Sequence, residues 1–327
     1  MRLRNLHLNL FATALLAIST LSAQVSAPVL GYVPDGGHLR PVQGIAAASA
    51  VMPALDSREF ARAAVSPRQD YALAALADTG EVAVMRPGGA VRTLSGVNVS
   101  PDAIALSPNG SAAALYYAGT RHFQIIKGLP DTAPDSGNVR EIDATFLGGA
   151  PAAFAISDDA DWLAGAWALG VYAFGPHGEV NRLPLDDSAT ALAFFHASHN
   201  LALATATGFY TVADVGGRNL VGVPMPTAVP ITAVPINDAR FVALTVNNRR
   251  AIVAGASGQI TAFDLDTGTS LTTDCACTPE GLFAMGRNAF RLNSLKFGAF
   301  KLFDADTGEV LFAPLSAQEA AAEGARQ

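Results

Sequence analysis

One strand-and-turn unit recurs along most of this chain and constrains its fold more than any other feature. A short apolar run ends in a polar turn, most clearly at Ala103-Ile-Ala-Leu-Ser-Pro-Asn-Gly110 and Ala153-Phe-Ala-Ile-Ser-Asp-Asp-Ala160. A second apolar segment follows each turn, so each copy predicts two antiparallel strands. Further copies begin at Ala61, Ala191, Phe241 and Gly281.

A second pair of strands completes the unit. Phe263-Asp-Leu-Asp-Thr-Gly268 matches Phe303-Asp-Ala-Asp-Thr-Gly308, about 40 residues further along the chain. In such hairpins the Asp side chain bonds the turn backbone, and Gly takes the positive φ that other residues avoid. The unit therefore has four antiparallel strands in about 44 residues, which is the length of one blade of a β-propeller.

The repeat predicts an all-β fold, a β-propeller of four-stranded antiparallel blades. Six copies are complete, and residues 28–60 add a shorter unit whose hairpin turns at Asp35-Gly36-Gly37. We favour seven blades, with the irregular first blade pairing with the C-terminal one so that no strand edge stays exposed. Six blades with an accessory hairpin are the alternative. Alternation between apolar runs and Gly or Pro turns excludes a parallel βαβ fold.

The N-terminus reads as a secretory signal peptide covering residues 1–23. Arg2 and Arg4 precede an apolar segment from Leu8 to Leu21, and a small-residue cleavage site ends at Ala23. An uncleaved anchor is the alternative, but the apolar segment is shorter than the roughly 20 residues that cross a bilayer. We therefore expect an exported protein, periplasmic or extracellular, with no membrane span after cleavage.

Two further segments complete the predicted organisation. The propeller should cover residues 24–315, and residues 316–327 should form a disordered or frayed helical tail. The chain has 327 residues, of which 50% are hydrophobic and 15% are charged, with a formal net charge of −7. This composition excludes intrinsic disorder and argues against a nucleic-acid partner. We expect a monomer.

The turn that ends at Gly110 and the two Phe-Asp-x-Asp-Thr-Gly hairpins resemble those of bacterial secreted β-propellers of the YVTN and quinoprotein-like kind. The resemblance covers residues 28–315 and concerns the fold. Quinoprotein repeats continue the hairpin to a tryptophan, whereas Leu271 and Phe312 stand near that place here. We therefore expect no quinone and no other cofactor.

Cys275 and Cys277 are the two cysteines of the chain. In an extended strand these positions face the same way, near the upper limit of Cα separation for a disulfide. A bend in the loop could close the bond after export. Two free thiols, or a redox or metal role, are the alternatives. The pattern for covalent haem is absent.

Two polar clusters have spacings that metal sites also use, but a turn explains each of them. His196 and His199 lie in a turn between strands, with no catalytic Glu beside them as in helical zinc motifs. Asp158, Asp159 and Asp161 occupy the turn of another copy. We expect solvated turn residues and no metal. Because Gly-x-Ser-x-Gly is also absent, we assign no catalytic residue.

Propeller architecture suggests where a ligand would bind. First strands line the central channel, and ligands usually meet the loops between blades and between second and third strands. These loops carry Asp78, Arg121, His122, Asp186 and Asp187, which could form a polar channel mouth. Ordinary exposed loop residues are the alternative.

Three functions are compatible with these features. The first is an exported, non-catalytic binding or interaction module for a protein or glycan partner in the cell envelope. The second is a propeller enzyme, a lactonase or a quinone-type dehydrogenase, with a site at the central channel. The third is a structural module without a ligand. We favour the first, because the sequence contains no catalytic constellation.

Overall fold

The computed structural model describes residues 27–55, 58–88, 91–131, 138–185, 188–216, 228–230, 238–286, 288–295 and 299–316. The predicted signal peptide, Asp186, Asp187 and residues 317–327 of the predicted tail lie outside these ranges. Among the described residues no helix is long and apolar enough to cross a membrane.

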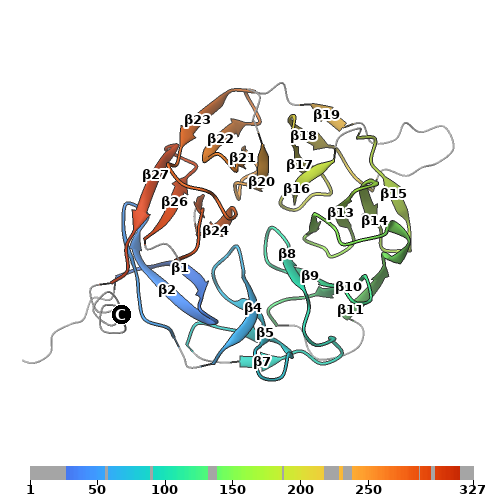
Figure 1. The fold of residues 1–327 in the computed structure, drawn as a ribbon, viewed down its shortest axis with the longest axis horizontal. Helices are drawn as coiled ribbons and strands as arrows, with labels where there is room; N and C mark the ends of the chain where they lie inside the picture. Colours follow the sequence, from blue (N-terminus) through green and yellow to red (C-terminus); the bar gives the residue numbers. More distant parts are fainter. Residues whose placement is uncertain are drawn as a thin grey trace, which may run out of the picture.

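Seven antiparallel sheets form a ring, so the chain is a seven-bladed β-propeller (Figure 1). The six-bladed alternative is therefore wrong. In the described residues six sheets have four strands and the first has three. The first blade contains β1 (Val29–Asp35), β2 (His38–Ile45) and β3 (Ala48–Val51).

The other six blades run from the axis to the rim in chain order (Figure 1). The innermost, first strands are β4 (Phe60–Val65), β8 (Ala103–Leu106), β12 (Ala153–Ile156), β16 (Ala189–Phe194), β20 (Ala239–Leu244) and β24 (Phe283–Met285). The second strands are β5 (Ala72–Leu76), β9 (Ala112–Tyr117), β13 (Leu163–Trp167), β17 (Leu201–Thr205), β21 (Arg250–Gly255) and β25 (Ala289–Arg291). The third strands are β6 (Val82–Met85), β10 (His122–Lys127), β14 (Gly170–Phe174), β18 (Phe209–Val212), β22 (Gln259–Asp264) and β26 (Phe300–Asp304). The outermost, fourth strands are β7 (Val91–Thr93), β11 (Val139–Asp143), β15 (Val180–Arg182), β19 (Ala228–Pro230), β23 (Ser270–Asp274) and β27 (Glu309–Ala313).

The recurring polar turn, which begins at Ser66, Ser107, Ser157 or Thr245, joins first and second strands on one face of the ring, which we call face A. Ser107 begins one such turn and is fully buried, and its backbone oxygen accepts a hydrogen bond from the backbone nitrogen of Gly110 over 2.9 Å. Its hydroxyl also accepts a bond from Ala112 N over 3.1 Å. A buried hydroxyl therefore replaces ladder bonds that the turning backbone cannot make. The turns between second and third strands lie on the opposite face, face B.

The first blade lacks an innermost strand. Its β1 begins on face A, where Gly31 lies against Gln69 and Met285. The turn after β1 lies on face B, where Gly37 O accepts a bond from Phe60 N over 2.8 Å. β1 therefore runs from face A to face B, as second strands do in the other blades. The strands β1, β2 and β3 thus correspond to second, third and fourth strands.

The C-terminal end of the described chain closes the ring. Val51 of β3 and Leu315 form a parallel bridge. Val51 N donates to Pro314 O over 2.9 Å, and Ser316 N donates to Val51 O over 2.9 Å. The segment after the last blade thus covers the outer edge of the first blade, as the sequence led us to expect.

Each interface between neighbouring blades has its own apolar core. One core joins the third and fourth blades through Phe123 and Trp167, whose rings meet edge to face with centroids 6.2 Å apart. Another joins the fifth and sixth blades through the stacked rings of Phe209 and Phe263. Because alanines fill the buried faces of β5 and β9, the larger side chains of neighbouring blades can pack closely against these strands.

Candidate functional site

The central channel is a cavity of about 470 Å³ lined by residues from all seven blades. Every innermost strand contributes to its wall, and Tyr32 and Pro34 of β1 stand where the first blade lacks such a strand. Most of the lining side chains are aliphatic or aromatic. In the described wall, polar side chains come from Tyr32, His196, Asn288 and Arg291.

Arg291 is the one arginine or lysine in this described lining. It ends β25, pairs in register with Phe283 of β24, and is only 5% exposed. Its guanidinium carbon lies 4.1 Å from the centre of the Phe283 ring. Nη1 donates to Asn293 O over 2.7 Å, whereas Nε is buried without a hydrogen-bond partner among the described residues.

The charge of Arg291 has no carboxylate within ion-pair distance in the described structure. Burial lowers the pKa of Arg291 to about 10, and Glu280 and Asp35 act in the opposite direction. Both acids have other partners: Glu280 accepts from Ser294 N over 3.1 Å, and Asp35 pairs with Arg40 at 3.1 Å. Since a pKa of about 10 lies above neutral pH, Arg291 places a positive charge in the channel wall.

His196 stands at the face A mouth of the channel. Its backbone is fixed by Asn248 of the next blade, which accepts from His196 N over 2.8 Å and donates to His196 O over 3.0 Å. Burial lowers the pKa of the His196 ring, while Asp158 acts in the opposite direction. The ring is therefore neutral at neutral pH.

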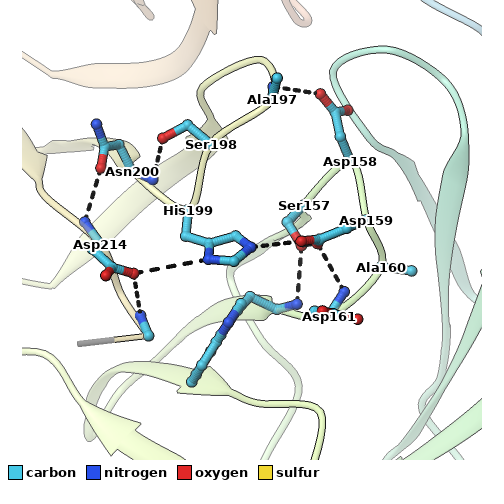
Figure 2. Close-up of polar contacts among 12 residues, drawn as sticks. Ser157, Asp158, Asp159, Ala160, Asp161, Ala197, Ser198, His199, Asn200 and Asp214 are labelled. Atoms are coloured by element: carbon cyan, nitrogen blue, oxygen red, sulfur yellow. Dashed lines mark hydrogen bonds and ion pairs between the residues drawn. The ribbon is translucent and has the colours of Figure 1, made fainter. Parts of the chain in front are cut away.

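A chain of polar contacts on face A links the turns of neighbouring blades. Asp158 Oδ1 accepts from Asn109 N over 2.7 Å, and Asp158 Oδ2 accepts from Ala197 N over 2.8 Å. The second of these contacts crosses from one turn to the next in Figure 2. One carboxylate thus joins three blades.

His199 extends this network. Figure 2 shows its ring between Asp159 and Asp214. Its Nε2 lies 2.6 Å from Asp159 Oδ2, and its Nδ1 lies 3.8 Å from Asp214 Oδ1. Burial would raise the pKa of Asp159, but hydrogen bonds from Ser157 and His199 and from the backbone of Asp161 outweigh it and lower this pKa. His199 stays partly exposed in its turn, with 34% of its side chain accessible, and it also contacts a turn of the neighbouring blade, because adjacent blades pack their turns side by side.

These turns do not gather metal ligands. Among the described residues there is no group of three or more His, Cys, Asp or Glu side chains that could hold a metal ion. The Asp159 side chain bonds its own turn, since its Oδ1 accepts from Ser157 Oγ over 2.6 Å and from Asp161 N over 3.0 Å. The arrangement joins the turns of neighbouring blades.

Asp78, Arg121 and His122 were predicted to form a polar channel mouth. In the structure they do not line the described channel wall. Asp78 is exposed in the turn after β5 and accepts from Thr79 N over 2.8 Å. Arg121 and His122 lie in and after the turn between β9 and β10, where His122 Nε2 stands 3.9 Å from Asp143. These turns join strands farther from the axis than the lining strands. Ligand binding by Asp78, Arg121 and His122, and by Asp186 and Asp187 outside the described residues, stays a prediction.

Cys275 and Cys277 are joined by a disulfide, with their Cα atoms 5.1 Å apart. The loop bends because Asp274 Oδ1 accepts from Ala276 N over 2.7 Å and Ala276 adopts a φ of +46°. Lys301 Nζ donates to Cys275 O over 2.6 Å and to Ala276 O over 2.7 Å. Lys301 of the last blade therefore holds the loop after β23, and the disulfide closes that loop.

Comparison with known proteins finds no protein-family model that matches this sequence and no significantly similar curated protein.

Sequence reasoning missed Arg291 and Gln69. The alternation of Ala289-Phe-Arg-Leu-Asn293 predicts a strand, but it does not say whether the arginine faces solvent or a channel. Gln69 stands where another copy has Gly110, so a non-glycine residue at the last position of the turn was the available signal.

Proposed function

We propose that this chain is an exported, non-catalytic β-propeller that binds a partner of the cell envelope through its central channel. The channel itself carries the proposal, because all seven blades frame one mostly apolar cavity of about 470 Å³. Ligand cavities in proteins commonly measure about 300–1,000 Å³ and combine apolar walls with a few polar groups. The channel meets this description.

The wall chemistry distinguishes between the two kinds of partner that the sequence suggested. Apolar walls favour a partner that presents an apolar group, since such a group is stabilised by leaving water. The hydroxyls of a glycan would lose hydrogen bonds to water and meet few polar side chains. A protein therefore suits the channel better than a glycan does.

The enzyme alternative receives no support from a specific observation. A lactonase or a quinone-type dehydrogenase would need acid–base groups or metal ligands at the channel. The described channel lining includes no Asp, Glu or Cys, and His196 is its one histidine. The binding module is therefore the function that the geometry supports best.

The test is affinity capture from envelope extract with the chain that starts at Gln24, compared between two variants with the same added side chain. Ala105 of β8 lines the channel, so Ala105→Trp fills it. Ala118 is exposed in the turn after β9, and Ala118→Trp is the control. We expect the unmodified chain and Ala118→Trp to capture one partner, and Ala105→Trp to lose it.

A melting curve of each variant checks its fold, and Ala243→Trp in β20 fills the channel from another blade if Ala105→Trp is unstable. Equal capture by a folded, filled variant would contradict the channel as the site. The N-terminal mass of exported material tests the leader separately, because cleavage after Ala23 leaves Gln24 first.

A further inference from the structure

The channel wall contains a charged side chain, Arg291, that forms no ion pair with the other described residues. Arg291 is 5% exposed, and only Nη1 of its guanidinium has a hydrogen-bond partner among the described residues. A buried charge without a counter-ion destabilises a folded protein. An anion bound in the channel would supply the counter-ion that Arg291 lacks.

The free edge of the guanidinium has a defined shape. Nη1 is occupied by Asn293 O, which leaves Nε and Nη2 on the unpaired edge of the planar group. Nε is buried, so a ligand reaches both nitrogens once the guanidinium shifts. Two parallel N–H donors on such an edge match the two oxygens of a carboxylate. The guanidinium carbon also lies 4.1 Å from the centre of the Phe283 ring, so this ring packs against the charged group.

The surroundings of Arg291 restrict the rest of the ligand. Arg291 and Phe283 stand toward face B, because β24 begins there and runs to the turn at Gly286 on face A. From this point the channel wall continues along apolar side chains of the other first strands, among them Ile104, Leu192 and Val242. One cation next to a long apolar wall suits a molecule with one negative charge and an apolar body.

We propose that Arg291 is the carboxylate-binding group of a channel site for a small aliphatic carboxylic acid. The acid binds Nε and Nη2 with its two oxygens after a small shift of the guanidinium, and its chain lies along the first strands. This inference rests on the proposed function in one respect, namely that the channel is the binding site. The acid then competes with the apolar group of the envelope partner.

The net charge of the chain is opposite in sign to the charge of Arg291. The sequence carries a formal charge of −7, so its average surface repels anions. A single buried cation in an apolar channel is therefore a local exception. A multiply charged anion such as a phosphate would need further cations, and the described channel lining holds no other arginine or lysine.

The experiment compares decanoate with decanol, which has the same chain length and no charge. Calorimetry measures their binding to the unmodified chain, to Arg291→Met and to Arg249→Met. Arg249 is an exposed arginine that pairs with Asp266 at 3.0 Å and is the matched control. We expect decanoate to bind the unmodified chain and Arg249→Met alike, and Arg291→Met about 10- to 100-fold more weakly. Decanol should bind all three equally.

The stability of the ligand-free variants shows whether Arg291 serves to bind a ligand or to stabilise the fold. If Arg291 serves a ligand, Arg291→Met should melt at or above the temperature of the unmodified chain, because it removes an uncompensated buried charge. If Arg291→Met does not fold, Arg291→Gln keeps a polar side chain without the charge and takes its place. A large loss of stability in both variants would overturn the proposal in favour of a structural arginine.

The remaining outcomes are distinct for the two proposals. Equal binding of decanoate and decanol that Ala105→Trp abolishes would overturn the role of Arg291 and leave the channel as a binding site. No binding of decanoate by the unmodified chain would overturn the acid site, while partner capture tests the channel independently. Tighter binding of a short peptide with an apolar C-terminal residue than of decanoate would replace the aliphatic acid by a peptide carboxylate.

Discussion

Gln69 accepts a hydrogen bond from the backbone nitrogen of Tyr32 over 2.6 Å, across the boundary between the second and first blades. The same side chain donates from Nε2 to Ala284 O of the seventh blade over 2.5 Å. Gln69 adopts a φ of +62°, where another copy of the turn has Gly110 at +69°. One amide therefore spans the place where the first blade lacks its innermost strand, although its backbone conformation favours glycine.

Replacing Gln69 tests this bridge. Gln69→Ala removes both bonds and leaves the backbone groups of Tyr32 and Ala284 without these partners, so the free energy of unfolding should fall by about 3 kcal/mol. Arg68→Ala is the control, because Arg68 is half-exposed and its ion pair in the described part of the chain is with nearby Asp70 at 3.0 Å. It should change stability by about 0.5 kcal/mol or less. Urea unfolding measures both, and similar stabilities would show that the ring closes without Gln69.

The contact between Asp159 and His199 predicts a dependence of stability on pH. The pKa of Asp159 is lowered from 3.8 in the folded protein. Such a carboxylate stabilises the fold above its unfolded pKa, and this contribution is lost as the pH falls through the folded pKa. Asp159→Asn should therefore lower the free energy of unfolding by about 1 kcal/mol near neutral pH, discounted for the partial exposure of the pair.

The difference between the original protein and Asp159→Asn should shrink as the pH falls below 3.8, the reference value for this carboxyl. Unfolding curves at several acidic pH values measure it. Asp161→Asn is the control, because in the described contacts the Asp161 backbone, rather than its side chain, bonds Asp159. A pH-independent difference would show that shape, and not charge, makes Asp159 important.

The disulfide between Cys275 and Cys277 predicts a labelling result. Alkylation of exported material should label neither thiol without reductant and both after reduction. Because the bond closes a very short loop, the Cys275→Ser, Cys277→Ser double variant should lose no more than about 2 kcal/mol of stability. Two thiols that label freely in native material would contradict the bond.

The repeated hairpins could be predicted from sequence because each is specified by neighbouring residues. In the hairpin that follows Phe263, Asp264 Oδ1 accepts from Thr267 N over 2.9 Å. Asp304 accepts from Asp306 N over 2.8 Å in the matching hairpin. Strand alternation and turn chemistry act within a few residues, so they are visible in the sequence. The third strand of the first blade, β3, was missed because Ala48–Val51 has no comparable turn signal.

The channel site could be predicted only in outline. The architecture implied that first strands line the channel, and β8 and β12 do so. The polar residues proposed for its mouth, such as Arg121 and His122, lie at a turn between strands that are farther from the axis. Arg291 belongs to a second strand, and it reaches the wall beside Phe283, its partner in the short first strand β24. No pattern within β25 records that orientation.

The sequence by itself determined the repeating unit, the turns and the ring of blades, because these follow from short-range hydrogen bonding and from the alternation of apolar residues. Only the tertiary structure decided which polar residues meet. Asp158 reaches two neighbouring blades and His199 meets Asp159, because the turns of adjacent blades pack side by side. Arg291 remains without a carboxylate partner among the described residues, because Glu280 and Asp35 have other partners. These contacts depend on the relative position of whole sheets, which is set by the packing between blades.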